Sequence, residues 1–218
     1  MKKKMTLYAA ISLLAVFVLW TILVKFVDVG TIGPNGTSVG FATLNGAVHR
    51  LTGVHMSIYI LTDWLGLIPI ATALGFAILG LVQLIKRKSL FKVDRNLLAL
   101  GIFYIVVIAV YLLFELLVIN YRPVLIDGAL EASYPSSTTL LVTCVMPTAA
   151  IQLNKRIKNK ALRCFVVSLI IAFTAFMVIS RLICGVHWIT DIIGGALLSS
   201  GLVLFYRALE NDTRDHGI

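Results

Sequence analysis

The chain has 218 residues, of which 59% are hydrophobic and only 13% are charged, and its formal net charge is +9 at pH 7. This composition is typical of an integral membrane protein and excludes a water-soluble globular enzyme. The positive charge needs no nucleic acid, because basic residues that flank membrane helices and attract anionic lipid headgroups account for it. We therefore expect the bilayer as a partner and no nucleic acid.

Apolar stretches long enough to cross a bilayer recur along the chain. A helix needs about 20 residues to cross the hydrocarbon core, and backbone groups in lipid must be satisfied within the helix itself. We predict six transmembrane helices, at residues 5–23, 65–85, 97–119, 136–153, 161–179 and 187–206. The expected fold is all-α, an integral membrane bundle of six transmembrane helices in which residues 1–218 form one domain.

The beginning of the chain and the segment after the first predicted helix need separate interpretation. Lys2, Lys3 and Lys4 precede the first apolar stretch, as in a signal peptide, but this stretch is too long and lacks a small-residue cleavage site. We expect a retained anchor. Residues 28–63 are rich in Gly and Thr and contain a weakly amphipathic stretch. Two interpretations stay open for them, a re-entrant or interfacial element and a plain loop.

Basic residues are divided unevenly between the two ends of the predicted helices. Fifteen of the 19 Lys and Arg residues fall at the end that holds both termini, and Lys25, Arg50, Arg122 and Arg181 fall at the other. The positive-inside rule therefore predicts that both termini are cytoplasmic. Arginines on the outer side run against this rule, so another requirement must keep them there.

Residues suited to phosphate chemistry gather at this outer end. His187 and Asp191 are four apart, a spacing that would place them on one helix face, where a carboxylate can fix the imidazole tautomer. Arg181 lies just upstream, where a turn could fold it over the same spot. Pro135 and Ser136 mark a helix N-terminus, whose free amides and positive dipole end attract phosphate, although a simple capped helix would show the same pattern.

Three segments contain these residues. They are Asn120-Tyr121-Arg122-Pro123, Tyr134-Pro135-Ser136-Ser137-Thr138, and residues 180–191, in which Ser-Arg, five residues, His, three residues and Asp follow one another. In order and spacing they resemble the tripartite signature of the type 2 phosphatidic acid phosphatase superfamily of membrane lipid phosphatases. The resemblance implies that His187 attacks phosphorus to form a phosphohistidine and that Asp191 orients it. It implies a phosphate site made by Arg122, Ser136, Ser137, Thr138 and Arg181, with no metal and no cofactor.

Two positions depart from that signature. Glu115 stands where the family has a Lys, and we expect it to point away, to pair with Arg122 or Lys25, or to contact a cationic group of the substrate. Thr138 stands where the family has a His that protonates the leaving oxygen. Without this acid, cleavage of a lipid monoester should be slow, because its leaving group needs a proton. The leaving group of a diphosphate is itself a phosphate, whose second pKa is about 6, so it can depart without an acid.

The leaving-group chemistry favours a polyprenyl diphosphate, such as the carrier recycled in cell-wall synthesis, over a lipid monophosphate. We therefore predict a lipid phosphatase of a bacterial-type plasma membrane, with its site on the extracytoplasmic face. Two alternatives remain open. The first is a pseudoenzyme that binds a phospholipid or carrier lipid without turnover, and the second is a lipid phosphotransferase that passes the phosphoryl group to another acceptor.

Overall fold

The computed structural model describes residues 2–215, and the side chains of residues 3–210. In chain order the helices are α1 (Lys2–Phe26), α2 (Ala42–Thr52), α3 (Met56–Leu65), α4 (Leu67–Arg87), α5 (Arg95–Leu116), α6 (Ser137–Arg156), α7 (Lys160–Ile183) and α8 (Ile189–Asp215). Two 3-10 turns, η1 (Pro34–Gly36) and η2 (Leu90–Lys92), lie in the connections. The predicted all-α class is confirmed.

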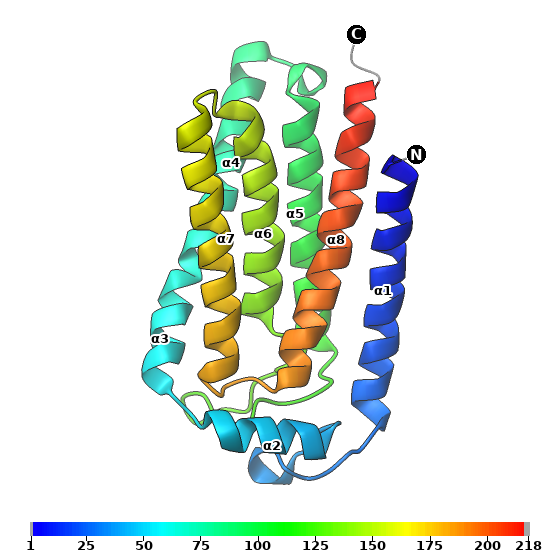
Figure 1. Cartoon of the computed structure of the whole chain (residues 1–218), viewed down its shortest axis with the longest axis vertical. Helices are drawn as coiled ribbons and strands as arrows, with labels where there is room; N and C mark the ends of the chain where they lie inside the picture. The colour runs from blue at the N-terminus through cyan, green and yellow to red at the C-terminus, as the bar shows by residue number, and fades with distance from the viewer. Residues whose placement is uncertain (1, 216–218) are drawn as a thin grey trace.

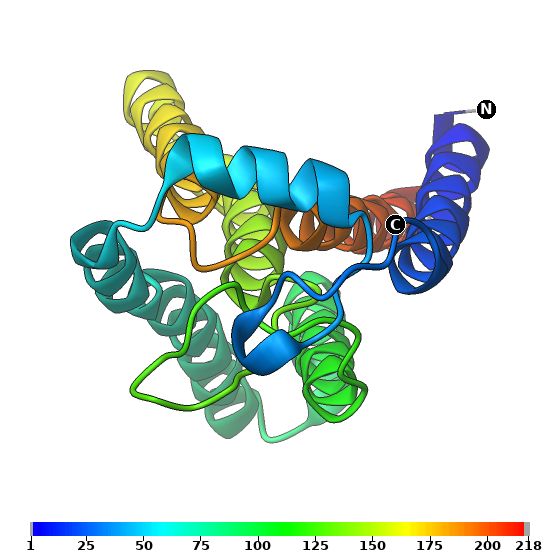
Figure 2. The ribbon, with the colours of Figure 1, turned by 90° about the horizontal axis from the view of Figure 1, so that it is seen from below.

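The long helices form an elongated bundle (Figure 1). α8 packs against α1 on one side and α6 on the other, and α6 also contacts α4, α5 and α7. α6 is therefore enclosed by four other helices. Seen from below, α2 lies across one end of the bundle, over the end of α7 and the start of α8 (Figure 2). Asn45 of α2 joins it to α8 through a hydrogen bond to Thr190 Oγ1 at 3.0 Å, and it also donates to Gly40 O in the preceding connection at 2.7 Å.

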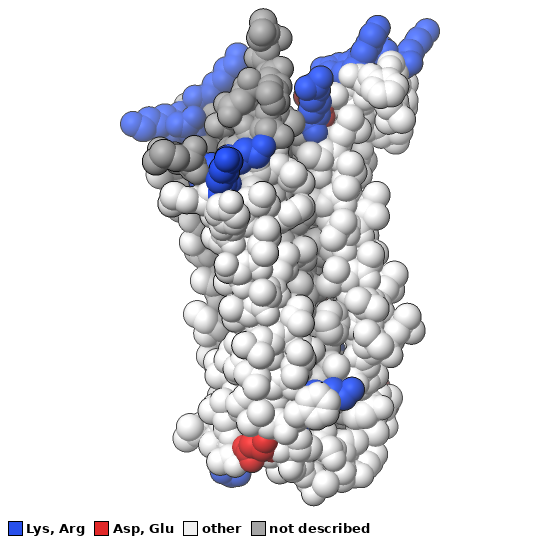
Figure 3. Space-filling view, turned by 90° about the vertical axis from the view of Figure 1, so that its right-hand side faces the viewer, with Lys and Arg blue, Asp and Glu red and all other residues white. Residues whose placement is uncertain are grey.

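The described part of the chain contains five helical stretches that are long and apolar enough to cross a membrane. They are Lys3–Phe26, Met56–Arg87, Arg95–Leu116, Lys160–Ile183 and Ile189–Glu210. Their outward side chains are largely Leu, Ile, Val and Phe. On the face drawn in Figure 3, Lys and Arg gather at the end with the termini, and an uncharged belt separates them from the few charges at the other end. The protein is an integral, multi-pass membrane protein.

α6 corresponds to the predicted span at residues 136–153, but it is less apolar than the five stretches above. Thr139, Thr148 and Gln152 are fully buried in it, and hydroxyl groups bond to the preceding turn, as in Thr148 Oγ1 to Cys144 O at 2.8 Å. Since α6 faces other helices, its polar groups are shielded from lipid. Hydropathy alone therefore understates how well this helix fits inside the bundle.

Several predicted boundaries are wrong in a way that matters for the site. α5 ends at Leu116 instead of residue 119, and α7 continues to Ile183 instead of ending at 179. α8 begins at Ile189, so His187 lies in the loop before the helix. The plain-loop interpretation of residues 28–63 is also wrong, since this segment contains α2 and most of α3.

Candidate active site

The three segments singled out in the sequence meet at the end of the bundle opposite the termini. The α5–α6 loop carries the first segment, and the second runs from the end of this loop into the first turn of α6. The end of α7, the α7–α8 loop and the start of α8 carry the third. Ser136 N donates to Asp191 O at 3.1 Å, and Trp188 Nε1 donates to Tyr121 O at 2.7 Å. These two bonds join the third segment to each of the others.

His187 and Asp191 come together for a different reason from the one expected. They do not share a helix face, because His187 lies outside α8. Instead Asp191 sits in the first turn of α8, and its Oδ2 accepts the backbone N–H of Trp188 at 2.9 Å, as a helix-capping carboxylate does. This bond closes the turn that brings the imidazole back over the carboxylate. Both residues are buried.

Ser133 lies between the two side chains. Nδ1 of His187 is 3.8 Å from Oδ2 of Asp191, too far for a hydrogen bond. Ser133 Oγ lies 3.1 Å from that Nδ1 and donates its hydrogen to Oδ2 of Asp191. Since the single hydroxyl hydrogen goes to the carboxylate, Oγ accepts the hydrogen of Nδ1. Nε2 of His187 then carries a free lone pair, and it has no hydrogen-bond partner among the described residues.

The environment of His187 favours the neutral imidazole. The residue lies in a loop outside the membrane-spanning helices and is 3% exposed. Burial lowers the pKa of His187 below its ordinary value of 6.5, and the positive charges of Arg122 and Arg181 act in the same direction, whereas Asp191 opposes them. A neutral imidazole with a free Nε2 is a competent nucleophile.

The two arginines of the predicted phosphate site lie on one aromatic ring. The Cζ atoms of Arg181 and Arg122 are 5.0 Å and 5.8 Å from the ring centroid of Tyr59 in α3. Arg181 is 1% exposed and forms a salt bridge to Asp63 at 3.2 Å, and Arg122 pairs with Glu131 at 3.1 Å. Buried nitrogens of both, Nη1 of Arg122 and Nε of Arg181, have no hydrogen-bond partner among residues 3–210.

The hydroxyl residues of the second segment occupy the start of α6. Ser136 is the N-cap, with Oγ accepting from Thr139 N at 3.5 Å, so the capped-helix interpretation holds. Ser137 is the first helical residue, and Thr138 follows in the same turn, partly buried. The free amides of this turn point toward the end of the bundle where the arginines lie.

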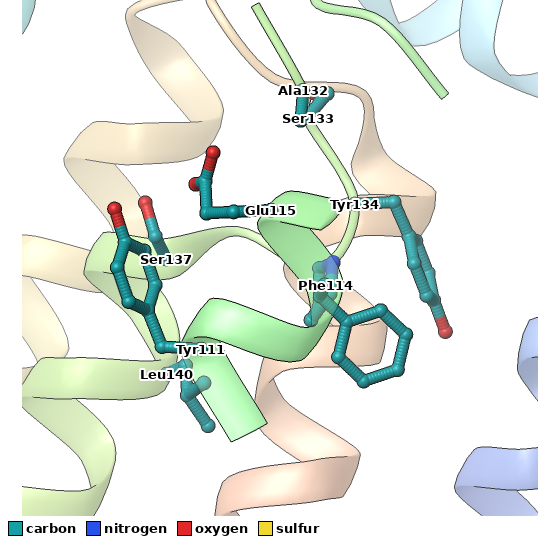
Figure 4. Close-up of a pocket in the computed structure, with 9 residues that line it drawn as sticks. Tyr111, Phe114, Glu115, Ala132, Ser133, Tyr134, Ser137 and Leu140 are labelled. Carbon is teal, nitrogen blue, oxygen red and sulfur yellow. The ribbon is translucent and has the colours of Figure 1, made fainter. Parts of the chain in front are cut away.

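A cavity of about 570 Å³ opens between α5 and the α5–α6 loop. Arg122, Glu131 and Ser137 line it, together with Glu115 and Tyr111 of α5. A narrow neighbouring cavity extends to Ser133, and Figure 4 shows the Glu115 carboxylate and the Ser137 and Tyr111 hydroxyls on one side of it. Arg122 was one of the partners expected for Glu115, but it forms its salt bridge with Glu131 instead. Within the described residues, no group of three or more His, Cys, Asp or Glu side chains is placed to hold a metal ion.

Bundle and loops together define a multi-pass, all-helical membrane protein whose polar site lies at one end. Residues 116–214, which contain all three segments, match the PAP2 superfamily. This match covers the carboxyl-terminal part of the chain, and it agrees with the family that the sequence resemblance predicted.

A solved structure supports the same fold. The chain is similar to the crystal structure of the first transmembrane PAP2 type phosphatidylglycerolphosphate phosphatase from Bacillus subtilis, with a TM-score of 0.55 and 22% identity over 95% of this chain and 97% of that one. At this identity the likeness concerns the fold. Among curated proteins none matches this chain closely.

Three residues at the site escaped the sequence-based prediction. Ser133 lies two positions before Pro135, and Tyr59 and Asp63 lie in the segment that was left open between two interpretations. Nothing in the spacing of Tyr59 or Asp63 marks them, because the contact between α3 and the α7–α8 loop is long-range. Ser133 could have been noticed as a small polar residue beside the second segment.

Proposed function

We propose that the protein is a lipid phosphate phosphatase that acts through a phosphohistidine on His187. The observation that carries this proposal is the arrangement around one buried imidazole. Its Nδ1 is bound through Ser133 to Asp191, its Nε2 has no partner among the described residues, and the charges of Arg122 and Arg181, which share the ring of Tyr59, act on it. A nucleophile needs a lone pair facing the substrate, and a transferring phosphoryl group needs fixed positive charge around its oxygens. Both requirements have candidates here.

In the proposed mechanism, Nε2 of His187 forms a bond to phosphorus as the bond between phosphorus and the leaving oxygen breaks. The imidazole becomes positively charged, and Asp191 stabilises this charge through the Ser133 hydroxyl. Arg122 and Arg181 bind the equatorial oxygens, and the amides and hydroxyls of Ser136, Ser137 and Thr138 complete the phosphate site. Water then attacks the phosphohistidine, releasing inorganic phosphate and restoring the neutral imidazole. No metal or cofactor takes part in this scheme.

We further propose that α6 is the sixth membrane-spanning helix, that the chain is one domain, and that the site faces away from the cytoplasm. α6 runs beside α5, α7 and α8 over the height of the bundle (Figure 1). The concentration of Lys and Arg at the end with the termini supports cytoplasmic termini in a bacterial-type plasma membrane. Tagging each end and testing its accessibility in intact cells checks this orientation.

Two substrate classes compete for the site. Thr138 favours a polyprenyl diphosphate, because a phosphate leaving group departs without a strong acid. The similar structure from Bacillus subtilis is described as a phosphatidylglycerolphosphate phosphatase, and this favours a lipid monoester. Phosphate release from polyprenyl diphosphate, phosphatidylglycerolphosphate and phosphatidate by the same preparation separates them. A Thr138→His variant should gain monoester activity by about a hundredfold if the missing acid limits that reaction.

The phosphohistidine is tested by trapping. Substrate labelled in its terminal phosphate should leave acid-labile, alkali-stable label on the wild-type protein and none on a His187→Ala variant. A pseudoenzyme would bind the lipid without labelling or turnover, and a phosphotransferase would be labelled but would release phosphate only to a lipid or alcohol acceptor. Label that persists in His187→Ala would rule out the proposed nucleophile.

A further inference from the structure

α3 brings two side chains to the arginines of the site. Tyr59 and Asp63 are four residues apart in the helix and so lie on the same face, one turn from each other. Tyr59 contacts both guanidinium groups through its ring, and Asp63 contacts only Arg181. This helix lies outside residues 116–214, so the three signature segments do not account for either contact.

The start of α3 is fixed to the loop that carries His187. His55 N donates to Cys184 O at 3.0 Å, and Tyr59 N bonds back to His55 O at 3.1 Å. Just before α3, the chain passes so close to this loop that a Cβ on Gly185 would lie 1.9 Å from Gly53 O. The backbone beneath the Tyr59 ring is thus held by the loop itself.

The ring is also held by side chains from the stretches of chain that follow the two arginines. Tyr59 packs against a cluster formed by Ile126, Cys184 and Val186. Ile126 follows Arg122 by four residues, and Cys184 and Val186 follow Arg181 in the third segment. Because the Tyr59 ring packs between these two stretches of chain, it sets the distance between them as well as the positions of Arg122 and Arg181.

We infer that Tyr59 is a positioning residue that holds Arg122 and Arg181 together for one phosphate group. Two guanidinium groups beside one ring repel each other, and the negative face of the aromatic ring attracts both. With Cζ distances of 5.0 Å and 5.8 Å, the ring lies within cation–π range of both. This inference rests on the proposed phosphate site.

The carboxylates that pair with the two arginines cannot hold them together for a phosphate as the Tyr59 ring does. The side chains of Asp63 and Glu131 are 64% and 41% exposed, and their negative charge competes with the phosphate for the same guanidinium groups. The Tyr59 ring is uncharged and leaves the donor nitrogens of both arginines available. It can therefore stay in place when phosphate binds, while the carboxylates must give way.

The test compares substitutions of Tyr59 in the full-length protein in detergent or vesicles. Inorganic phosphate and orthovanadate serve as inhibitors, and a short-chain phosphatidate or diphosphate lipid serves as substrate. Tyr59→Leu should raise the inhibition constants for phosphate and vanadate by about 5- to 30-fold. KM should rise with them and kcat should change less, because the ring acts on the arginines and not on His187. Tyr59→Phe keeps the ring and should stay near wild type.

Controls separate positioning from folding and from the proposed function. Ile60→Val changes an exposed neighbour on α3 and should leave all constants unchanged, and thermal unfolding shows whether Tyr59→Leu is folded. If Tyr59→Leu is folded and inhibited by phosphate as the wild type is, or if Tyr59→Phe loses as much affinity as Tyr59→Leu, Tyr59 does not position the arginines. A wild type that neither binds inorganic phosphate nor releases it from any lipid refutes the proposed function instead.

Discussion

Replacing Ser133 with Ala removes the hydroxyl that joins His187 to Asp191. In the structure Oγ is 3.1 Å from Nδ1 and donates to Oδ2, whereas Nδ1 and Oδ2 are 3.8 Å apart. Without this hydroxyl, Nδ1 has no acceptor within hydrogen-bond distance unless the backbone around Asp191 moves. That movement is opposed by the bond from Trp188 N to Oδ2, which fixes the carboxylate in the first turn of α8.

The size of the effect follows from the charge that develops on the imidazole. Hydrogen bonds to charged groups contribute about 1.5–3 kcal/mol, and this stabilisation acts mainly once His187 has bonded to phosphorus. A loss of this size corresponds to a roughly 10- to 150-fold decrease in kcat. KM should change little, because the arginines still bind the phosphate. Since Ser133 is 2% exposed, the unmet polar groups should also lower the free energy of unfolding by about 1–3 kcal/mol.

The assay is steady-state phosphate release by Ser133→Ala, Ser133→Thr, Asp191→Asn and the Ser133→Ala/Asp191→Asn double variant. Ser133→Thr keeps the hydroxyl and should retain more activity than Ser133→Ala. If Ser133 transmits the effect of Asp191, the double variant should be little slower than the slower single variant. Additive losses, or a Ser133→Ala variant with wild-type kcat, would show that Asp191 acts on His187 without the hydroxyl and would refute the relay.

Three other changes test the charges around the site. Asp63→Asn removes the exposed carboxylate that pairs with Arg181 and should tighten inhibition by inorganic phosphate about two- to fivefold, with the effect weakening as salt is added. Glu115→Lys replaces a carboxylate that lines the same cavity as Arg122, and it should tighten inhibition by inorganic phosphate by roughly tenfold or more. Inhibition no tighter than that of the wild type would mean that Glu115 does not face the phosphate. Because burial lowers the pKa of His187 below 6.5, the reactive neutral form persists in mild acid, so kcat/KM should begin to fall only below that pH, and a fall centred above it contradicts the described environment.

The sequence predicted the helices better than it predicted their ends. Long apolar stretches identify α1, α4, α5 and α7 because lipid demands such stretches. Their ends depend on local contacts that hydropathy does not report. The α7–α8 connection shows the consequence, because the predicted span began at His187, whereas the loop continues through His187 and α8 begins at Ile189. α2 and α3 were missed as helices because the Gly and Thr content of residues 28–63 favours loops, whereas burial of Asn45 against Thr190 stabilises α2 in place.

The site was predictable in its three segments and unpredictable in what links them. Arg122 and Arg181 could be assigned to one phosphate site from a signature in the sequence, since spacing within each segment is local information. Tyr59, which contacts both, lies 63 and 122 positions away. A ring at that separation has no local pattern, because only the docking of α3 on the α7–α8 loop brings it to the site.

The two departures from the family signature lie on the same side of the site. Glu115 belongs to α5 and Thr138 to the first turn of α6, next to Ser137, which lines the cavity between α5 and the α5–α6 loop. The supports of the nucleophile come from several elements: Asp191 from α8, Arg181 from α7, Tyr59 from α3 and Ser133 from the α5–α6 loop. A protein that had lost turnover would have no reason to keep a buried imidazole bound through a hydroxyl to a buried carboxylate, because unmet groups of this kind are costly. The presence of this linked imidazole beside Thr138 supports the proposed phosphatase with an altered leaving group over the pseudoenzyme alternative.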